Sequence, residues 1–335
     1  MKPRLAIIPG DPSGIGPELV ARISANEEIL NQADVLLVGD RHVFMKGAKQ
    51  ATVEIKLEEC NLEFDDWQGK SGLPWYPTES IQPYEVDIGK STKASGRSVI
   101  ATLDVSLGLL QDSIIDGLVF APFNKEAMHM AGLGHADELH YMAEKLKVNG
   151  FVTELNTLDG LWVSRVTSHM ALRDVACSVT EEGICKAVLL LNKTLKASGI
   201  DSPRIAVAAL NPHAGEGGSF GDEEIEIIHP ALAKLRSSGI DVCGPMPSDT
   251  IFLKARAGEV DGVVAMYHDQ GQIALKLMGF DRGVTVHGGL PFPITTPAHG
   301  TAFDIAGQGN ADDGAMTAAF EVACDLITAG RSSAE

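Results

Sequence analysis

Three histidines of this 335-residue chain, His169, His213 and His268, lie just beyond short apolar runs that predict β-strands. The runs that precede them are Trp162–Val166, Ile205–Leu210 and Gly262–Met266. In an open parallel sheet, ligands bind in the crevice outside the carboxyl ends of the strands. Three imidazoles that meet there can hold a divalent cation and leave positions for water or substrate. We therefore predict a shared catalytic metal site, with ordinary hydrogen-bonding loop histidines as the alternative.

Two carboxylates and a lysine accompany these histidines, at Asp249, Asp269 and Lys276. Asp269 follows His268 directly, and Lys276 lies on the helix expected after it. A desolvated lysine or an aspartate near a cation can have its pKa tuned for proton transfer, which hydride removal from an alcohol requires. We predict catalytic roles for all three. The structural alternatives are a helix-capping aspartate and a surface lysine.

Two glycine-rich turns are candidates for nucleotide binding. The first, Pro9–Glu18, follows an apolar run but lacks the GxGxxG spacing of a standard dinucleotide fingerprint. The second is the loop His299–Gly307, in which Asp304 can accept hydrogen bonds from ribose hydroxyls and would repel a 2′-phosphate. This loop favours NAD over NADP. Its predicted cofactor contacts are His299, Gly300, Thr301, Ala302 and Asp304.

The elements that must position these residues alternate along the whole chain, as is typical of parallel βαβ units. Further strand-like runs are Leu5–Ile8, Val35–Val38 and Gly117–Ala121. Amphipathic stretches of helical type are Pro17–Ile23, Ser98–Leu110, Glu181–Leu195, Glu223–Leu235 and Ala315–Ile327. We predict an α/β fold whose parallel strands bring the strand-end residues together.

Composition excludes several classes of protein. A formal net charge of −18 argues against a nucleic-acid partner, which requires a clustered basic surface. The five cysteines are odd in number and form no CxxC pair, so neither a disulfide framework nor a thiolate zinc site is indicated. No apolar run approaches the roughly 20 residues of a membrane span. The apolar run near the N-terminus is too short for the hydrophobic region of a secretory signal. We expect a cytoplasmic enzyme without membrane contact.

Four motifs resemble the 4-hydroxythreonine-4-phosphate dehydrogenase family. They are Pro9–Glu18, Asn211–Gly218, Met266–Gly271 and His299–Gly307. The first also resembles the opening of isocitrate and isopropylmalate dehydrogenases, and the last resembles the adenine-side NAD loop of isopropylmalate dehydrogenases. The resemblance covers nearly the whole chain. It implies a homodimer of two-domain subunits, with two α/β/α domains and the active site in the interdomain cleft.

The resemblance also implies where the parts of that site lie. Residues 1–130 plus 290–335 form the first domain, with the NAD loop, and residues 131–289 form the second, with metal and dimer contacts. The three histidines bind a divalent metal (Zn, Co, Ni, Mn or Mg) in a site shared across the dimer. Lys276 corresponds to the family's substrate lysine, and Asp249 and Asp269 correspond to its acids. The metal and Lys276 lower the pKa of a hydroxyl β to a carboxylate while hydride leaves to NAD, and the β-keto acid then loses CO2.

The substrate wall differs from that of the pyridoxal-pathway members. Their substrate-contacting His-Thr pair corresponds here to a segment with His135 and Asp137, of which His135 matches. Thr285 stands where they have asparagine, and Ile294 where they have an arginine that isoleucine cannot replace as an anion clamp. The segment Ala121–Glu126 instead resembles a paralogous branch that oxidises four-carbon sugar-acid phosphates. The predicted substrate contacts are His135, Asp137, Lys276 and Thr285.

The leading hypothesis is NAD- and metal-dependent oxidative decarboxylation of a small β-hydroxy acid such as D-threonate or D-erythronate 4-phosphate. Three alternatives stay open. Rescue of a pyridoxine auxotroph would favour the 4-hydroxythreonine-4-phosphate dehydrogenase of pyridoxal phosphate biosynthesis. Activity on unphosphorylated substrates would favour a diol-acid dehydrogenase. Failure to bind metal or to produce NADH would favour a non-catalytic NAD- or metabolite-binding protein.

Overall fold

The computed structural model describes residues 2–61 and 71–332, which divide into two compact units. The first unit comprises Met1–Val152 and Val284–Ser332, and the second begins at Thr153 and ends at Gly283. The second unit is thus inserted into the sequence of the first. The boundaries predicted from the sequence lie after residues 130 and 289, so residues 131–152 and 284–289 belong to a different unit from the one expected.

Packing explains both differences. Tyr141 and Met142 of helix α6 (Glu138–Lys145) belong to the core cluster of the first unit. Strand β11 (Val284–Gly288) pairs antiparallel with β12 (Ile294–Pro297), which in turn pairs with a strand of the first unit. These side-chain and strand contacts are long-range, and local composition carries no trace of them.

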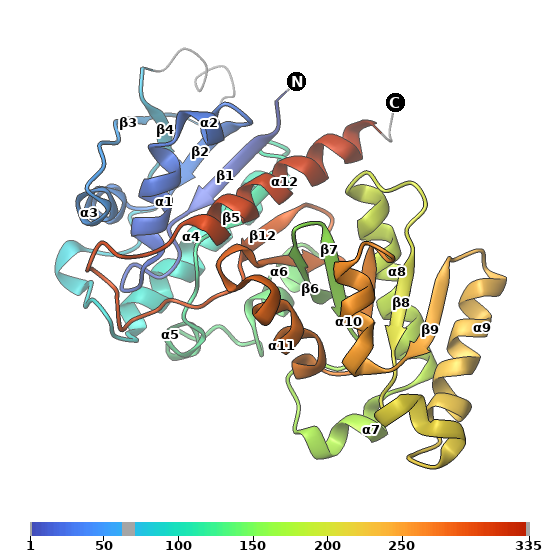
Figure 1. Cartoon of the computed structure of the whole chain (residues 1–335). Helices are drawn as coiled ribbons and strands as arrows, with labels where there is room; N and C mark the ends of the chain where they lie inside the picture. The colour runs from blue at the N-terminus through green and yellow to red at the C-terminus, as the bar shows by residue number, and fades with distance from the viewer. Residues whose placement is uncertain (1, 62–70, 333–335) are drawn as a thin grey trace. The chain divides into compact units, whose positions relative to one another are not determined.

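The first unit contains a seven-strand run of sheet in the order β3-β4-β2-β1-β5-β12-β11. Its remaining strands are β1 (Arg4–Ile8), β2 (Asp34–Val38), β3 (Leu57–Glu59), β4 (Leu73–Tyr76) and β5 (Gly117–Phe120) (Figure 1). All pairs are parallel except β11 with β12. Its helices, besides α6, are α1 (Gly16–Ser24), α2 (Glu27–Leu30), α3 (Arg41–Ala51), α4 (Lys93–Gln111), α5 (Lys125–Met130) and α12 (Gly314–Ser332), with a short 3₁₀ turn at Pro83–Glu85.

Alternating side chains bury both faces of this sheet. On one face Ile8, Leu118 and Phe120 join a core cluster with apolar residues of α4 and α6. The other face packs against α12, where the buried Thr295 hydroxyl donates a 2.7 Å hydrogen bond to the carbonyl of Ala319. The result is the predicted α/β/α layering.

The second unit has five strands in the order β6-β7-β10-β8-β9. They are β6 (Thr153–Leu158), β7 (Leu161–Arg165), β8 (Ile205–Ala208), β9 (Val242–Met246) and β10 (Gly262–Ala265), and only β6 with β7 is an antiparallel pair. The helices are α7 (Val175–Ser178), α8 (Glu181–Ala197), α9 (His229–Ser237), α10 (Ser248–Arg256) and α11 (His268–Gly279). Short helical turns lie at Leu172–Asp174, Pro212–Gly218, Glu224–Ile228 and Phe280–Arg282.

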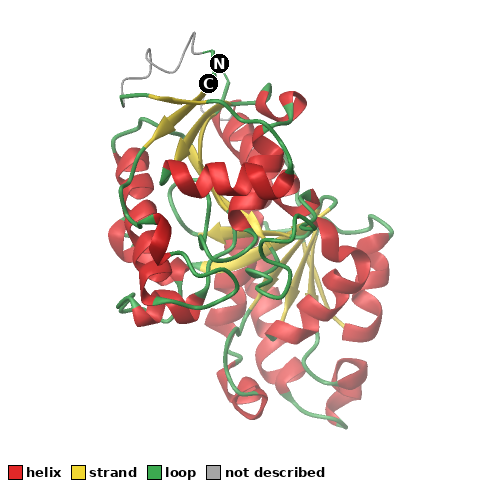
Figure 2. Ribbon diagram, turned by 90° about the vertical axis from the view of Figure 1, so that its left-hand side faces the viewer, coloured by secondary structure: helices red, strands yellow, loops and turns green. Residues whose placement is uncertain are grey.

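Helices also cover both faces of the second sheet. Val163, Ala206 and Val263 share a core cluster with residues of α10 and α11. On the opposite face α8 approaches so closely that a Cβ at Gly262 would lie 2.9 Å from a methyl group of Leu191. Figure 2 shows helices on both sides of the strands within each unit.

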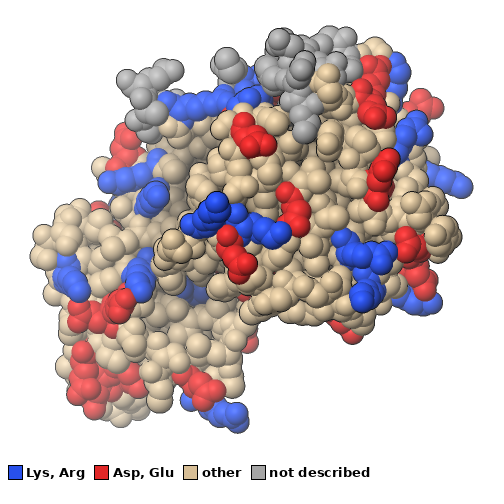
Figure 3. Space-filling view, turned by 180° about the vertical axis from the view of Figure 1, so that it is seen from behind, with Lys and Arg blue, Asp and Glu red and all other residues tan. Residues whose placement is uncertain are grey.

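Surface and hydropathy are in keeping with the composition. Within the described residues, no helix combines the length and the apolar character needed to span a membrane. On the face drawn in Figure 3, acidic and basic side chains of the described residues are interspersed, without a broad basic band.

Candidate functional site

The three strands that precede His169, His213 and His268 are parallel neighbours in the second unit. Gly262 of β10 is in register with Trp162 of β7 on one side and with Ile205 of β8 on the other. Because parallel strands end at the same edge of a sheet, the segments that follow them leave from one edge. The arrangement of strands on which the metal prediction depends is therefore correct.

The chain brings two of the three histidines close together. The ring centroids of His169 and His268 lie 5.4 Å apart. His213 is exposed, and its ring centroid lies 6.3 Å from that of Phe220. Within residues 2–61 and 71–332 of this one chain, no set of three or more His, Cys, Asp or Glu side chains is arranged to hold a metal ion. His169 and His268 thus form a pair, to which His213 is not joined in the single chain.

The side chain of Asp269 holds the ring of His268. Its Oδ1 lies 2.7 Å from His268 Nδ1, at the start of α11. When Nδ1 carries the proton, the lone pair of Nε2 is available to a metal, and such carboxylate–histidine contacts are typical of metal ligands. The donor set of His169 and His268 therefore fits a divalent transition metal in its chemistry.

Glu224, which the sequence analysis missed, anchors the loop that carries His213. It is 1% exposed, and its Oε1 accepts hydrogen bonds from the backbone N–H groups of Leu210 and Asn211, both at 2.8 Å. Its Oε2 accepts a third from the amide nitrogen of Asn211 at 2.9 Å. A buried carboxylate with three donors fixes the start of the turn Pro212–Gly218.

That turn has an unusual backbone. Five consecutive residues, 213–217, have φ between 44° and 76°. For residues with a Cβ the left-handed region costs roughly 1–2 kcal/mol each, and strain of this kind gathers at functional sites. His213, Ala214 and Glu216 carry this strain. The turn is therefore held in place by surrounding contacts, among them those of Glu224.

A second residue that the sequence analysis missed, Gln270, ties three elements together at this edge. Its Oε1 accepts the N–H of Met266 at 2.6 Å, just after β10. Its Nε2 donates to the carbonyl of Ala209 and to the hydroxyl of Ser248, both at 2.8 Å. Gln270 therefore links the end of β10 to the end of β8 and to the start of α10, where Asp249 lies.

The two other predicted catalytic residues are on helices of the same unit. Asp249 is exposed in the first turn of α10, and Lys276 is exposed in the last turn of α11. Neither position is that of a buried structural residue. Their catalytic roles remain predictions.

The predicted NAD loop packs on the other glycine-rich turn. The N–H of Ile15 donates to the carbonyl of Thr301 at 3.1 Å, and a Cβ at Gly14 would lie 2.9 Å from Thr301 Cβ. Gly14 is thus required for the close approach of the two turns. Ala302 has φ 42°, a left-handed conformation, and Asp304 is exposed.

His299 begins this loop with a ring that suits ligand binding. Its Nδ1 lies 3.0 Å from the carbonyl of Gly300. Burial is the largest influence on its pKa and lowers it, so the ring is neutral near pH 7. Its buried Nε2 has no hydrogen-bond partner among the described residues. An orphaned imidazole nitrogen beside small residues and an exposed carboxylate fits a nucleotide.

The predicted substrate residues of the first unit have structural contacts as well. Asp137 caps α6, since its Oδ1 accepts the N–H of His140 at 2.9 Å. His135 Nε2 lies 3.1 Å from a carboxylate oxygen of Glu144. Thr285 is buried on β11, in register with Thr296.

Ile294, by contrast, is fully buried in the core cluster of the first unit. Its side chain packs on apolar neighbours and cannot reach an anion. Ile294 is therefore a core residue in this chain.

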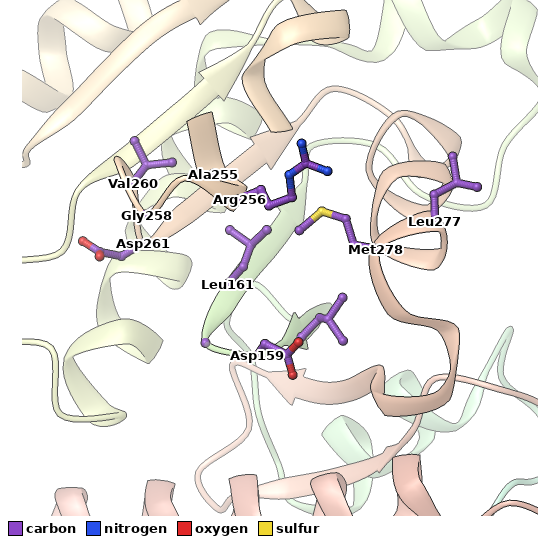
Figure 4. Close-up of a pocket in the computed structure, with 11 residues that line it drawn as sticks. Asp159, Leu161, Ala255, Arg256, Gly258, Val260, Asp261, Leu277 and Met278 are labelled. Carbon is purple, nitrogen blue, oxygen red and sulfur yellow. The ribbon is translucent and has the colours of Figure 1, made fainter. Parts of the chain in front are cut away.

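A cavity of about 630 Å³ lies at the other end of the second sheet. It is lined by Leu161 at the start of β7 and by Asp261 just before β10, so it is at the amino ends of the strands (Figure 4). Asp261 forms an ion pair with Arg204 at 2.8 Å, and Asp159 one with Arg282 at 3.1 Å. These paired carboxylates support a structural role for this cavity.

Comparison with known proteins gives consistent matches over the chain. The family model described as "Pyridoxal phosphate biosynthetic protein PdxA" matches residues 31–323. A Pseudomonas aeruginosa protein named "Putative 4-hydroxythreonine-4-phosphate dehydrogenase 2" is 49% identical, with 97% of each chain covered. An Oceanobacillus iheyensis protein named "Putative D-threonate 4-phosphate dehydrogenase" is 35% identical, with 97% of this chain and 98% of that protein covered.

Solved structures match over the same extent. That of 4-hydroxythreonine-4-phosphate dehydrogenase from Klebsiella pneumoniae has a TM-score of 0.84 and 33% identity, and 98% of each chain is covered. Isocitrate dehydrogenase from Methylococcus capsulatus has a TM-score of 0.50 at 15% identity, with 99% of this chain and 88% of that chain covered. The latter likeness concerns the fold alone. The isocitrate dehydrogenase-like α/β fold predicted from the sequence is confirmed.

Proposed function

Since the chain belongs to the family of the pyridoxal phosphate biosynthetic protein PdxA, we propose that it oxidises the hydroxyl group of a phosphorylated hydroxy acid with NAD as hydride acceptor. The observation that carries the proposal is the set of three adjacent parallel strands that end in His169, His213 and His268. A crevice at such an edge is where open α/β sheets bind ligands.

The substrate we propose is D-threonate 4-phosphate or D-erythronate 4-phosphate. Two features of the first unit support this branch over 4-hydroxythreonine 4-phosphate. Ile294 is a core residue where the pyridoxal-pathway members have an arginine, and Thr285 stands where they have an asparagine. The name of the Oceanobacillus iheyensis relative points the same way. The pyridoxal-pathway substrate is the alternative, favoured by the name of the Pseudomonas aeruginosa relative.

The metal would be held by His169, His213 and His268, and when bound it would supply a Lewis acid that polarises the substrate's oxygen atoms. Because the described residues of one chain group His169 with His268 and not with His213, we propose that a second copy of the chain completes the ligand set in a homodimer. Asp269 orients the ring of His268 through its 2.7 Å contact.

The chain's own residues have distinct tasks in the reaction that we propose. Lys276 takes part in moving the hydroxyl proton as hydride leaves for NAD, and Asp249 is the second acid–base group. The orphaned Nε2 of His299 and the carboxylate of Asp304 bind the nucleotide. The products of oxidation are a β-keto acid, NADH and a proton. The C–C bond to the carboxylate of the keto acid then breaks to release CO2, and the carbon left as an enolate takes up a proton to give the ketone.

A direct assay tests the proposal. Purified protein is mixed with NAD, one divalent metal at a time, and a panel of tetronate 4-phosphates, 4-hydroxythreonine 4-phosphate and unphosphorylated acids. NADH absorbance and released CO2 are both followed. We expect turnover with a tetronate 4-phosphate and one CO2 for each NADH. NADH without CO2 would contradict decarboxylation, and turnover restricted to 4-hydroxythreonine 4-phosphate would favour the alternative.

The His213→Ala variant tests the metal ligands. We expect a loss of at least about a hundredfold in kcat, since loss of residues that merely support metal ligands already costs about 10- to 100-fold. Circular dichroism and thermal unfolding should be unchanged, because the side chain is exposed. Near-normal turnover by this variant would show that His213 does not bind the metal.

A further inference from the structure

A lysine, a glutamate and a histidine of the first unit form a charged cluster that the reaction above does not use. Lys125 Nζ lies 3.5 Å from Glu138 Oε2, and His287 Nε2 lies 4.0 Å from Glu138 Oε1. The side chain of His287 is fully buried and that of Glu138 is nearly so, whereas that of Lys125 is 44% exposed. The cluster thus extends from the buried His287 to the surface, where the ammonium group of Lys125 is exposed.

The sheet places this cluster beside the replaced arginine. Val286 of β11 is in register with Thr295 of β12, so the next pair along the ladder is His287 with Ile294. Directly opposed residues point to the same face of a sheet. The ring of His287 packs 5.2 Å from that of Phe120, which shares the core cluster of Ile294. His287 therefore lies against the position where related enzymes have their anion clamp.

Two of the predicted substrate contacts, Thr285 and Asp137, adjoin residues of the cluster. Thr285 lies two residues before His287, on the same face of β11. Asp137 precedes Glu138 at the start of α6. Lys125 begins α5, beyond the carboxyl end of β5, which is an edge where ligands of parallel sheets bind. Each member of the cluster therefore adjoins a residue or an edge already expected to face substrate.

The electrostatics of the cluster favour a fixed cation. Burial alone would raise the pKa of Glu138, but His287 and then Lys125 outweigh it and lower that pKa to about 2. Neither ring nitrogen of His287 has a hydrogen-bond partner among the described residues. A buried polar group without a partner is unfavourable. The carboxylate that this imidazole faces is the same one that pairs with Lys125.

We propose that Lys125 binds the phosphate group of the substrate, and that Glu138 and His287 are positioning residues that hold its ammonium group. The inference rests on the proposed function, since it assumes a phosphorylated hydroxy acid. Lysine commonly binds phosphate through its single point charge, and unlike arginine it does not need a bidentate arrangement of hydrogen bonds. Lys125 at the start of α5 thereby supplies a positive charge, whereas the buried Ile294 supplies none.

The first test compares two lysine variants in the full-length enzyme. Lys125→Met should raise KM for D-threonate 4-phosphate by about tenfold or more, with kcat changed less than about threefold and KM for NAD unchanged. Lys145→Met is a matched control, because Lys145 is also 44% exposed and also pairs with a carboxylate, that of Asp104 at 3.0 Å. The control should leave every constant within about twofold of wild type. Equal KM values for the two variants would overturn the proposal.

The second test asks whether Glu138 and His287 affect substrate binding through Lys125. His287→Asn and Glu138→Gln should each raise KM for the phosphorylated substrate by roughly threefold to tenfold while kcat is retained. In the Lys125→Met background, the same changes should have no further effect on KM, because the cation they position is gone. A purely structural pair would lower Tm and leave KM unchanged, and its effects would be the same with and without Lys125. Those results would overturn the positioning role.

Calorimetric binding of two separate probes distinguishes this inference from the proposed function. Inorganic phosphate should bind wild type, and Lys125→Met should weaken it about tenfold, which is about 1.4 kcal/mol. Unphosphorylated D-threonate should lose less than about twofold. A larger loss for D-threonate would mean that Lys125 binds the carboxylate, and no phosphate binding to wild type would also overturn the proposal. If phosphate binds through Lys125 but no phosphorylated acid is oxidised, the proposed function fails and this anion site stands.

Discussion

At the scale of single residues, Asp11 is a buried acid whose charge is poorly compensated. Its side chain is fully buried, and its Oδ2 has no hydrogen-bond partner among the described residues. Burial has the largest effect on its pKa, outweighs the N–H of Ser13 at 2.8 Å and the hydroxyl of Ser95, and raises the pKa to about 6. The carboxyl group is therefore neutral in mildly acidic solution.

This pKa predicts how stability depends on pH. Because the folded pKa is raised from 3.8 to about 6, the folded state holds the proton more tightly, and this contribution to stability is lost as pH rises from about 4 to about 6. Asp11→Asn removes the titration. We expect the variant to gain about 2 kcal/mol relative to wild type between pH 4 and pH 7, out of about 3 kcal/mol for the whole shift. Urea unfolding of both proteins at several pH values measures the difference, and a pH-independent gap would contradict the prediction.

The site residues differ in how far the sequence reveals them. His169, His213 and His268 could be found because each follows a strand-like run, and the order of the strands then placed them at one edge. Glu224 and Gln270 could not be found in this way, because their partners include backbone groups just beyond the end of β8, which sequence patterns do not bring near them. Gln270 lies in the family motif Met266–Gly271, but the predicted chemical roles in that motif belong to its histidine and aspartate. The predicted roles of the substrate and NAD residues stay predictions.

At the scale of elements, strands buried on both faces were the most predictable. The runs expected at residues 5–8, 35–38 and 205–210 are strands with ends shifted by up to two residues. The stretch 223–235 is a helical region that the structure divides into a π-helical turn, Glu224–Ile228, and α9. Strands β11 and β12 went unrecognised because threonine, histidine and proline interrupt their apolar pattern. What stabilises them is the pairing of β11 with β12 and of β12 with β5.

Two glycines of α4 allow a matched test of helix packing. A Cβ at Gly96 would lie 1.9 Å from the carbonyl oxygen of Ala127 on α5, whereas nothing lies within 4 Å of one at Gly108. Gly96→Ala should destabilise the protein by at least about 2 kcal/mol, because backbone must move. Gly108→Ala should stabilise it by up to about 1 kcal/mol through helix propensity. Chemical denaturation measures both, and equal effects would show that α4 and α5 are not packed as described.

At the scale of the whole molecule, the two units differ in how the chain builds them. The second unit is one continuous segment, 153–283, with its own core cluster. The first needs two segments, because Ile294 of β12 lies in its core and α12 covers its sheet. Sequence composition gave no sign of this division, since no linker separates the segments.

The division predicts the behaviour of fragments. A polypeptide of residues 153–283 should fold alone and unfold cooperatively, with Trp162 as its single tryptophan reporter, because all five strands and their core are present. A polypeptide of residues 1–152 lacks β11, β12 and α12 and should remain without a cooperative transition. Thermal scans of both fragments by fluorescence and circular dichroism check this. A sharp thermal transition in the fragment 1–152, which lacks part of the first unit's core, would contradict the division of the chain into these two units.

The insertion has a consequence for translation. The ribosome releases β1 to β5 early, but their partner β12 is synthesised only after the whole of segment 153–283. Because synthesis proceeds at about 5–20 residues per second, the edge of β5 stays unpaired for on the order of ten seconds before β12 is made. During that interval the nascent chain presents an apolar strand edge, and the inserted second unit can complete its fold before the first unit does.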